Sequence, residues 1–185
     1  MNSSRYDIFI DGGGNSFQSV AKYLSKFPAD KVYVFEPNPV FHQSYDNAPV
    51  TLVRSAIWTE DTYKRFFLSR DERQVASSLL EEKMCKRDDG SIGPFWRPEN
   101  IDVKCVDFAA WIREHTTPDQ RIALKLDIEG AEVPVLWHLL YENLLSRFAV
   151  IHVEFHLEKI PEQQESYNRL RDRLQDSGIV LHDWD

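Results

Sequence analysis

Short apolar runs alternate with longer amphipathic segments along most of this 185-residue chain. The apolar runs are rich in valine, isoleucine and phenylalanine, and the segments between them repeat apolar residues at helical spacing. This alternation is typical of β-α-β units with a mostly parallel sheet. It predicts strands at residues 8–10, 32–35, 50–57, 103–106, 122–126, 150–155 and 179–182, and helices at residues 17–27, 41–46, 108–112, 131–140 and 163–175.

Residues 58–98 break this pattern. They contain a strand-like run at residues 65–68, the pair Ser77 and Ser78, and the charged stretch EEKMCKRDDGSIGPFWRP. A long connection without its own periodicity is usually a functional lid or a mobile loop. Phe95 and Trp96 either pack over a pocket or pin the loop to the surface, and the two serines either contribute hydroxyls to a pocket or cap a helix.

The composition predicts a single domain, residues 1–185, that forms its core without disulfides or a metal. A net charge of −8 and a pI near 5.3 disfavour a nucleic-acid partner and favour small or neutral substrates. Cys85 and Cys105 lack the spacing of a metal site, so we interpret them as reduced thiols. The sequence has no signal-peptide pattern and no apolar run long enough to span a bilayer, and we expect a soluble, cytoplasmic protein.

Two acidic residues each end an apolar run, at points where the chain must turn. Asp11 closes YDIFID ahead of three glycines, residues 12–14, and Glu36 closes KVYVFE ahead of Pro37. Glycines without Cβ atoms let the backbone approach a ligand closely. Because ligands of open α/β sheets bind at the carboxyl ends of the strands, and an acid that ends the second strand typically binds ribose hydroxyls, we expect a cofactor that contains adenosine.

The glycine turn does not match the G-x-G-x-x-G motif of dinucleotide-binding folds, because Phe17 or Gln18 stands where the later glycine belongs. The carboxylate of Asp11 would also repel a pyrophosphate, whereas it would attract an ammonium or sulfonium group. Three simpler interpretations stay open: Asp11 caps the turn, Glu36 is a solvated strand end, and Asn38 either binds the ligand or initiates a turn.

A second acidic group lies in the segment IALKLDIEGAEVPVL, where Asp127, Glu129 and Glu132 mark a strand end and the start of a helix. Favourable electrostatics at the helix N-terminus also explain Glu132, and with it Glu129. Asp127 ends the strand, so we expect it to face the same crevice as the glycine turn. A metal site formed by these acids with His152 or His156 is another interpretation, but no paired histidine motif supports it.

The segment VIHVEFH carries a third set of polar side chains. His152, Glu154 and His156 alternate with apolar residues at strand spacing, which predicts that they point to one face of a strand. A histidine near the carboxyl end of that strand is a candidate general base, because its pKa lies near the operating pH. His156 is therefore either a base or a hydrogen-bonded structural residue, and Asp127 and Glu129 are alternative bases.

The segments IDGGGNS, VYVFEPNP, SAIW and LKLDIEGAE together resemble the FkbM-type family of S-adenosylmethionine-dependent methyltransferases, and the resemblance runs through most of the chain. It implies a single-domain, Rossmann-like class I methyltransferase sandwich, with a mostly parallel sheet of seven strands and helices on both faces. We expect the final antiparallel strand to be short or absent. The resemblance also implies S-adenosylmethionine as the cofactor and O-methylation of a hydroxyl on a sugar, lipid or small metabolite.

The resemblance assigns roles to residues that match the family's motifs. Asp11, Gly13 and Asn15 would contact the methionine end of the cofactor, and Asp127 would line the methyl-transfer site. The full set expected to bind the cofactor is Asp11, Gly12, Gly13, Asn15, Glu36, Asn38, Ala56, Ile57 and Asp127. The candidates for catalysis are Asp127, Glu129 and His156, and no metal is expected.

One position departs from the family. Its first motif usually reads D-x-G-x-N-x-G, and Phe17 stands at the place of the last glycine. The expected partner is a small-molecule or glycan acceptor. Two other functions stay open: a non-catalytic module that binds the cofactor, and an NAD-dependent oxidoreductase, which the charge of Asp11 disfavours.

Overall fold

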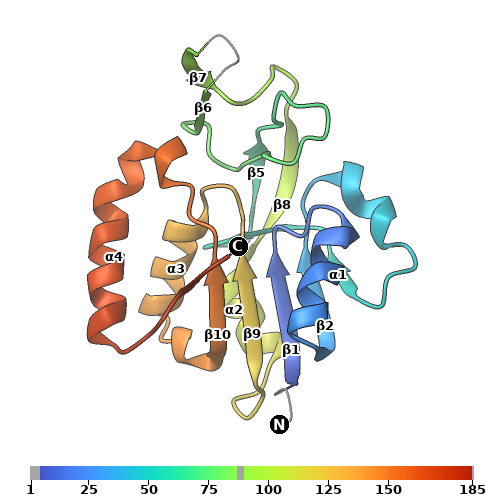
Figure 1. Ribbon diagram of the computed structural model, residues 1–185, viewed down its shortest axis with the longest axis vertical. Coiled ribbons are helices and arrows are strands. Elements are labelled where there is room, and N and C mark those ends of the chain that lie inside the picture. Colours follow the sequence, from blue (N-terminus) through green and yellow to red (C-terminus); the bar gives the residue numbers. More distant parts are fainter. Residues whose placement is uncertain (1–4, 87–89, 185) are drawn as a thin grey trace.

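The computed structural model of the chain describes residues 5–86 and 90–184, and its centre is a parallel β-sheet (Figure 1). The described part of this sheet has six strands in the order β11-β10-β9-β1-β2-β3, and every neighbouring pair is parallel. The strands are β1 (Tyr6–Gly12), β2 (Ala29–Phe35), β3 (Thr51–Val53), β9 (Ile122–Leu126), β10 (Phe148–Val153) and β11 (His182–Asp183). The chain order reverses between β1 and β9, which creates a crevice at their carboxyl ends.

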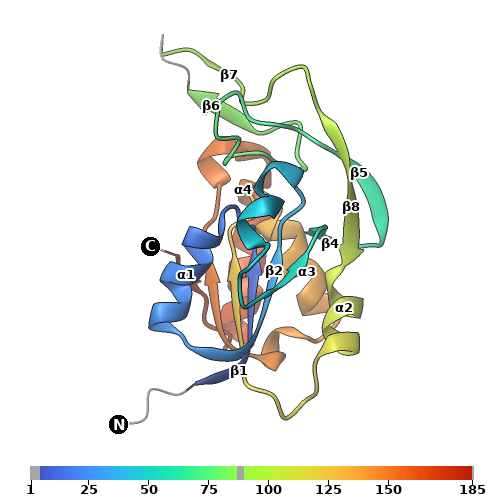
Figure 2. The same ribbon diagram turned by 90° about the vertical axis from the view of Figure 1, so that its right-hand side faces the viewer.

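Helices cover both faces of the sheet (Figure 2). Helix α1 (Phe17–Lys26) packs on one face, and α2 (Phe108–His115), α3 (Glu132–Tyr141) and α4 (Gln164–Asp176) pack on the other. Alternate residues along a strand point to opposite faces of the sheet and pack under the helices on those faces. Phe9 of β1 belongs to the core under α1, whereas Ile8 and Ile10 belong to the core under α2, α3 and α4. The predicted Rossmann-like α/β fold is confirmed.

The prediction of one strand over residues 50–57 is wrong. The structure divides this run into β3, which pairs with β2, and β4 (Ala56–Trp58), which pairs with β8 (Ile101–Asp107) in a second sheet. A tight turn separates them, in which the backbone N–H of Ser55 donates to the carbonyl of Val53 at 2.8 Å. Apolar periodicity does not reveal such a turn, because β3 and β4 are both apolar.

Residues 58–98 form more structure than the sequence predicts. Strand β5 (Thr62–Phe66) joins β4 and β8 in a three-stranded sheet, and β6 (Met84–Lys86) pairs with β7 (Ile92–Pro94). Residues 67–86 and 90–97, here called the cover segment, lie beyond the carboxyl ends of the main sheet (Figure 1). Two contacts hold distant parts of the cover segment together. Phe67 and Ser78 are joined by backbone hydrogen bonds, and Ser69 forms an isolated bridge with Trp96.

The remaining elements differ from the predictions mainly at their ends. The expected helix at residues 41–46 is a 3-10 helix, η1 (Pro39–Tyr45), and three further 3-10 turns follow later: η2 (Leu145–Arg147), η3 (Leu157–Lys159) and η4 (Pro161–Gln163). The last described strand, β11, has two residues and runs parallel to β10, so the described main sheet contains no antiparallel final strand. No helix in the described ranges has the length and apolar character needed to cross a membrane.

Candidate functional site: a cavity at the strand ends

A cavity of about 360 Å³ lies at the carboxyl ends of β1, β2 and β9, which is within the usual range for a small-molecule site. It occupies the crevice where the strand order reverses, and residues of the cover segment close its outer side. The structure brings most of the predicted site residues to this cavity. Those that line it are Gly13, Asn15, Glu36, Asn38, Ala56, Ile57, Asp127 and Glu129.

The glycine turn is shaped by its protein neighbours. Gly13 has φ +79°, and a Cβ atom there would lie 1.8 Å from the carbonyl oxygen of Asp127. The N–H groups of Gly13 and Gly14 both donate to the carbonyl of Phe35 at 3.1 Å, so these amides hold β1 to β2. Gly13 is therefore required for the close approach of β1 and β9. Gly12 is buried and does not line the cavity.

Asp11 is buried against a lysine of the neighbouring strand. Lys125 donates to Asp11 Oδ1 at 2.8 Å and to the carbonyl of Gly13 at 3.2 Å. Burial by itself lowers the pKa of Lys125, but the charges of Asp11 and Asp127 raise it above its usual value. Asp11 Oδ2 is buried without a hydrogen-bond partner among the described residues. Asp11 thus lies behind the cavity wall, and of this ion pair only Lys125 lines the cavity.

Glu36 ends β2 at the edge of the cavity. Its carboxylate accepts the backbone N–H of Asn15 at 2.7 Å and that of Asn38 at 2.6 Å. Burial raises the pKa of Glu36 to about 8, although these two hydrogen bonds act in the opposite direction. Asn38 Oδ1 accepts the N–H of Val40 and so caps η1. Asn38 therefore initiates the turn and also lines the cavity.

Phe17 does not line the cavity. Its ring packs edge-on against Tyr45 at a centroid distance of 6.0 Å, and its backbone N–H donates to Ser44 Oγ at 3.2 Å. The residue that replaces the family's glycine therefore begins α1 and points to η1. This placement leaves the cavity between Gly13 and Glu36 open.

Asp127 directly follows β9 and lines the cavity, with about a quarter of its side chain exposed. Burial raises its pKa to about 6, while the nearby charge of Lys125 lowers it and those of Glu154 and Glu129 raise it. Asp127 Oδ2 lies 3.7 Å from Lys125 Nζ. This carboxylate is ionised at neutral pH and can accept a proton there.

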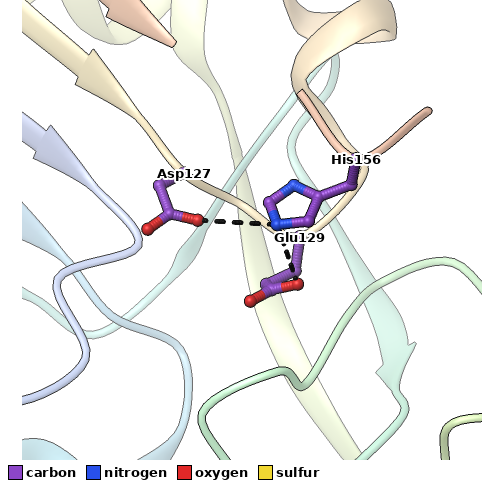
Figure 3. A group of neighbouring side chains, drawn as sticks. All are labelled: Asp127, Glu129 and His156. Atoms are coloured by element: carbon purple, nitrogen blue, oxygen red, sulfur yellow. Dashed lines mark ion pairs between the residues drawn. The ribbon is translucent and has the colours of Figure 1, made fainter. Parts of the chain in front are cut away.

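Asp127 and Glu129 point toward the same ring nitrogen of His156 (Figure 3). His156 Nε2 lies 3.2 Å from Glu129 Oε2 and 3.9 Å from Asp127 Oδ1. His156 Nδ1 lies 3.2 Å from Glu132 Oε1, which also accepts the N–H of Ile128 at 2.9 Å. Burial by itself lowers the pKa of His156, but the hydrogen bond and charge of Glu132 and the charge of Glu129 raise it above its usual value.

The same three side chains offer donor atoms within 4.8 Å of one another, which is compatible with a metal ion. The chain, however, already places cations on these oxygens. Lys83 forms an ion pair with Glu129, and Lys125 lies near Asp127. We therefore interpret Asp127, Glu129 and His156 as parts of an ion-pair cluster that the two lysines partly neutralise.

The prediction that His152, Glu154 and His156 share one strand face is wrong for His156. Strand β10 ends at Val153, so the alternation does not extend to His156, which lies buried beside Glu132 at the start of α3. The ring of His152 instead packs against Tyr23 of α1 at a centroid distance of 5.9 Å. The two histidines therefore lie in different environments.

The structure decides between the alternatives left open for the two serines and the two aromatic residues of the cover segment. Ser77 lines the cavity, and its hydroxyl donates to the carbonyl of Gln74; neither Ser77 nor Ser78 caps a helix. Phe95 is buried but does not line the cavity, and Trp96 Nε1 donates to the carbonyl of Glu81 at 3.1 Å. Phe95 and Trp96 thus do not pack over the cavity, and Trp96 holds two parts of the cover segment together.

Sequence reasoning missed Lys83, Lys125, Gln74 and Trp184. Lys125 and Lys83 are each about 1 % exposed, and Gln74 and Trp184 line the cavity. A lysine within the apolar run IALKL was a detectable signal, because a buried ammonium group requires a charged partner. Lys83 lies in a charged stretch that suggests a solvated loop, Gln74 lies three residues before Ser77 in a segment without regular periodicity, and Trp184 lies far from the other motifs in sequence.

The fold and the cavity define a Rossmann-like protein with a ligand site at the switch point of its sheet. The family model for the FkbM methyltransferase domain matches residues 10–181 of the 185, so the chain belongs to this family and is a methyltransferase. Comparison with the curated proteins found no match. Comparison with the solved structures found none either.

The residues that line the cavity are compatible with an adenosine-containing cofactor that carries a positive charge. Glu36 offers a carboxylate at the tip of β2, and Ala56 and Ile57 add apolar wall close to Phe35 for a flat base. Glu129 and Asp127 add negative charge to the same wall, which suits a cation. A dinucleotide would require glycine amides free for its pyrophosphate, and the amides of Gly13 and Gly14 are already bonded to Phe35.

Proposed function

We propose that the chain is an S-adenosylmethionine-dependent O-methyltransferase that acts on a hydroxyl of a sugar, lipid or small metabolite. The observation that carries the proposal is the position of Glu36. Its buried carboxylate lies at the tip of β2, next to Gly13 at the tip of β1, on a cavity at the switch point. A carboxylate at this place suits two ribose hydroxyls, and the family supplies the reaction class.

The cofactor would lie along the strand tips from Asn38 to Asp127. Glu36 would accept the ribose hydroxyls, and Ile57 with Ala56 would contact the adenine. Gly13 would lie at the methionine end, where Lys125 offers an ammonium group to a carboxylate. When bound, S-adenosylmethionine supplies an activated methyl group on a neutral leaving group. The protein's tasks are then alignment, exclusion of water and removal of the hydroxyl proton.

Asp127 is the base that the geometry favours for this proton. It lines the cavity and is ionised at neutral pH, whereas His156 is buried behind the wall with its Nδ1 held by Glu132. Glu129 also lines the cavity, but its carboxylate is engaged by Lys83. A hydroxyl proton would pass to Asp127, with Lys125 and His156 stabilising the ionised form before transfer.

The acceptor and the location in the cell are also proposals. The acidic wall formed by Asp127 and Glu129 suits a neutral polyhydroxy acceptor, because carboxylates accept hydrogen bonds from hydroxyls and repel anions. Both described cysteines, Cys85 and Cys105, are free, which supports a reducing compartment such as the cytoplasm.

Methyl transfer from labelled S-adenosylmethionine to a panel of acceptors tests the proposal. The panel contains sugars, lipids and small metabolites with free hydroxyls, and matched amines and thiols. The proposal expects label on a hydroxyl oxygen, loss of turnover in Asp127→Asn, and normal turnover in Asp176→Asn, which changes an exposed residue of α4. Label on nitrogen or sulfur alone, or none on any acceptor, would contradict it.

A further inference from the structure

Lys83 is a buried lysine in the cover segment, with about 1 % of its surface exposed. Its ammonium group forms an ion pair with Glu129, donates to the carbonyl of Ala76 at 2.7 Å, and lies 4.6 Å from the centre of the Phe95 ring. Lysine is seldom fully buried, because removing an ammonium group from water is costly unless it is paired. The cover segment therefore places a desolvated cation directly on a candidate catalytic carboxylate.

Glu129 adopts a backbone conformation that is unusual for its residue type. Its φ is +56°, in the left-handed region, which residues with a Cβ atom seldom adopt. Strain of this kind persists only where the surroundings enforce it. Ser78 Oγ donates to the carbonyl of Glu129 at 2.7 Å, and Lys83 binds its carboxylate. The cover segment thus contacts Glu129 through both its backbone and its side chain.

Two lysines lie at the Glu129 carboxylate, and Lys83 is the closer and more deeply buried of them, because Lys159 Nζ lies 3.9 Å from Glu129 Oε2 with a third of its side chain exposed. Three other acidic side chains, those of Asp127, Glu132 and Glu154, lie near the ring of His156. Like charges at such distances repel one another, and Glu129 also lines the cavity, so the repulsion acts to move its carboxylate away from the ring. The bond to Lys83 therefore keeps the carboxylate 3.2 Å from His156 Nε2.

We infer that Lys83 is a positioning residue of the methyl-transfer site, which holds the Glu129 carboxylate against His156 and so completes the acidic wall beside Asp127. Lys83 does not line the cavity, so it acts through Glu129 and touches neither cofactor nor acceptor. The cover segment is consequently part of the catalytic assembly. The effect on turnover rests on the proposed function, whereas the position of Glu129 does not.

The test is the pH titration of the His156 imidazole by NMR, with His156→Gln used to assign the signal. Loss of positioning moves an anion away from the ring, so Lys83→Met is expected to lower the pKa of His156 by about half a unit or more. Loss of a positive charge alone would instead raise it. The sign of the shift therefore separates positioning from simple charge removal.

The variants leave the other charged groups around the His156 ring unsubstituted. These groups are Asp127 after β9, Glu132 of α3, Glu154 after β10 and Lys159 of η3. Glu129→Gln is expected to lower the pKa of His156 as Lys83→Met does. In the double variant, Lys83→Met should add little further change. Lys83→Arg, which keeps the ion pair, should restore a value close to that of the wild type.

A rise or no change in the pKa of His156 in Lys83→Met would overturn the inference, as would an equal fall in the Glu129→Gln background. S-adenosylhomocysteine binding by Lys83→Met should stay within about threefold of the wild type, because Lys83 is outside the cavity wall. With an acceptor, kcat should fall at least about tenfold at an unchanged KM for the cofactor. If wild-type binding fails, the proposed function fails, and the titration still decides the role of Lys83.

Discussion

Asp11 and Lys125 lie directly opposite each other on β1 and β9, and their side chains form an ion pair of 2.8 Å that is almost completely buried. Lys125 also donates to the carbonyl of Gly13, so the pair fixes the glycine turn to the neighbouring strand. The acid that begins the family's first motif thus has a structural partner within the chain. Under the proposed function, Asp11 would act on ligand binding by holding Lys125, and through it Gly13, in place at the cavity.

Replacing Lys125 by methionine should destabilise the protein strongly. The change leaves the buried carboxylate of Asp11 without its partner, which typically costs about 3–5 kcal/mol. The free energy of unfolding from urea titration measures this. Lys104→Met is the control, since Lys104 is an exposed strand residue whose loss should cost less than about 0.5 kcal/mol. Similar losses in both variants would show that the ion pair is unimportant.

Gly13→Ala should abolish S-adenosylhomocysteine binding and destabilise the fold. The new Cβ would lie 1.8 Å from the backbone of Asp127, so β1 and β9 must separate at the cavity. Gly178→Ala is a matched control, because Gly178 also has positive φ but a Cβ there would have open space, with no described neighbour within 4 Å. It should cost about 1 kcal/mol of strain and leave binding unchanged. Thermal unfolding and calorimetry distinguish these outcomes, and equal effects of the two substitutions would contradict the packing argument.

Adenosine binding should strengthen as the pH rises through 8. Burial raises the pKa of Glu36 to about 8, so its carboxyl is mostly protonated at pH 6 and offers both oxygens as strong, charged acceptors for two ribose hydroxyls only at higher pH. Affinity should rise by up to about tenfold per pH unit below the pKa. Adenosine has no group that titrates in this range, and Glu36→Gln should remove the dependence. An affinity that is flat between pH 6 and 9 in the wild type would exclude Glu36 as the ribose ligand.

Turnover should depend on the ionisation of Asp127. Its pKa is raised by burial to about 6, so kcat/KM for the acceptor, measured at saturating cofactor, should increase between pH 5 and 7 and then level off if Asp127 is the base. Asp127→Asn should lower turnover by at least about a hundredfold above pH 7, where the wild-type carboxylate is ionised, and by less as the pH falls below 6. Initial rates with the acceptor found in the panel measure both effects. An unaltered acidic limb in Asp127→Asn would assign the base to another residue.

The sequence predicted the elements that carry the cavity better than those that cover it. Strand β9 was predicted with its observed ends, because IALKL is apolar and bounded by polar residues. The acids that end β2 and β9, Glu36 and Asp127, were expected at one crevice, and both line the cavity. Parallel strands bring their carboxyl ends together, so this followed from the alternation of elements alone.

Contacts between distant segments could not be predicted in this way. Lys83 and Glu129 are 46 residues apart, and nothing in the sequence links them. The prediction that His156 shares a strand face with His152 and Glu154 was wrong because it assumed that strand β10 continued past Val153. The roles of Asp11 and Gly13 changed for a similar reason: their partners, Lys125 and the backbone of Asp127, come from a strand more than 100 residues later.

The most direct test of the account is calorimetric titration of the purified protein with S-adenosylhomocysteine, alongside NAD. The account predicts a Kd of about 1–100 µM for S-adenosylhomocysteine in the wild type and no binding of NAD. Glu36→Ala should weaken binding at least about tenfold, whereas Glu162→Ala, an exposed acid in η4, should leave it unchanged. Binding of NAD, or S-adenosylhomocysteine binding that is equal in the wild type and Glu36→Ala, would contradict the assignment of this cavity.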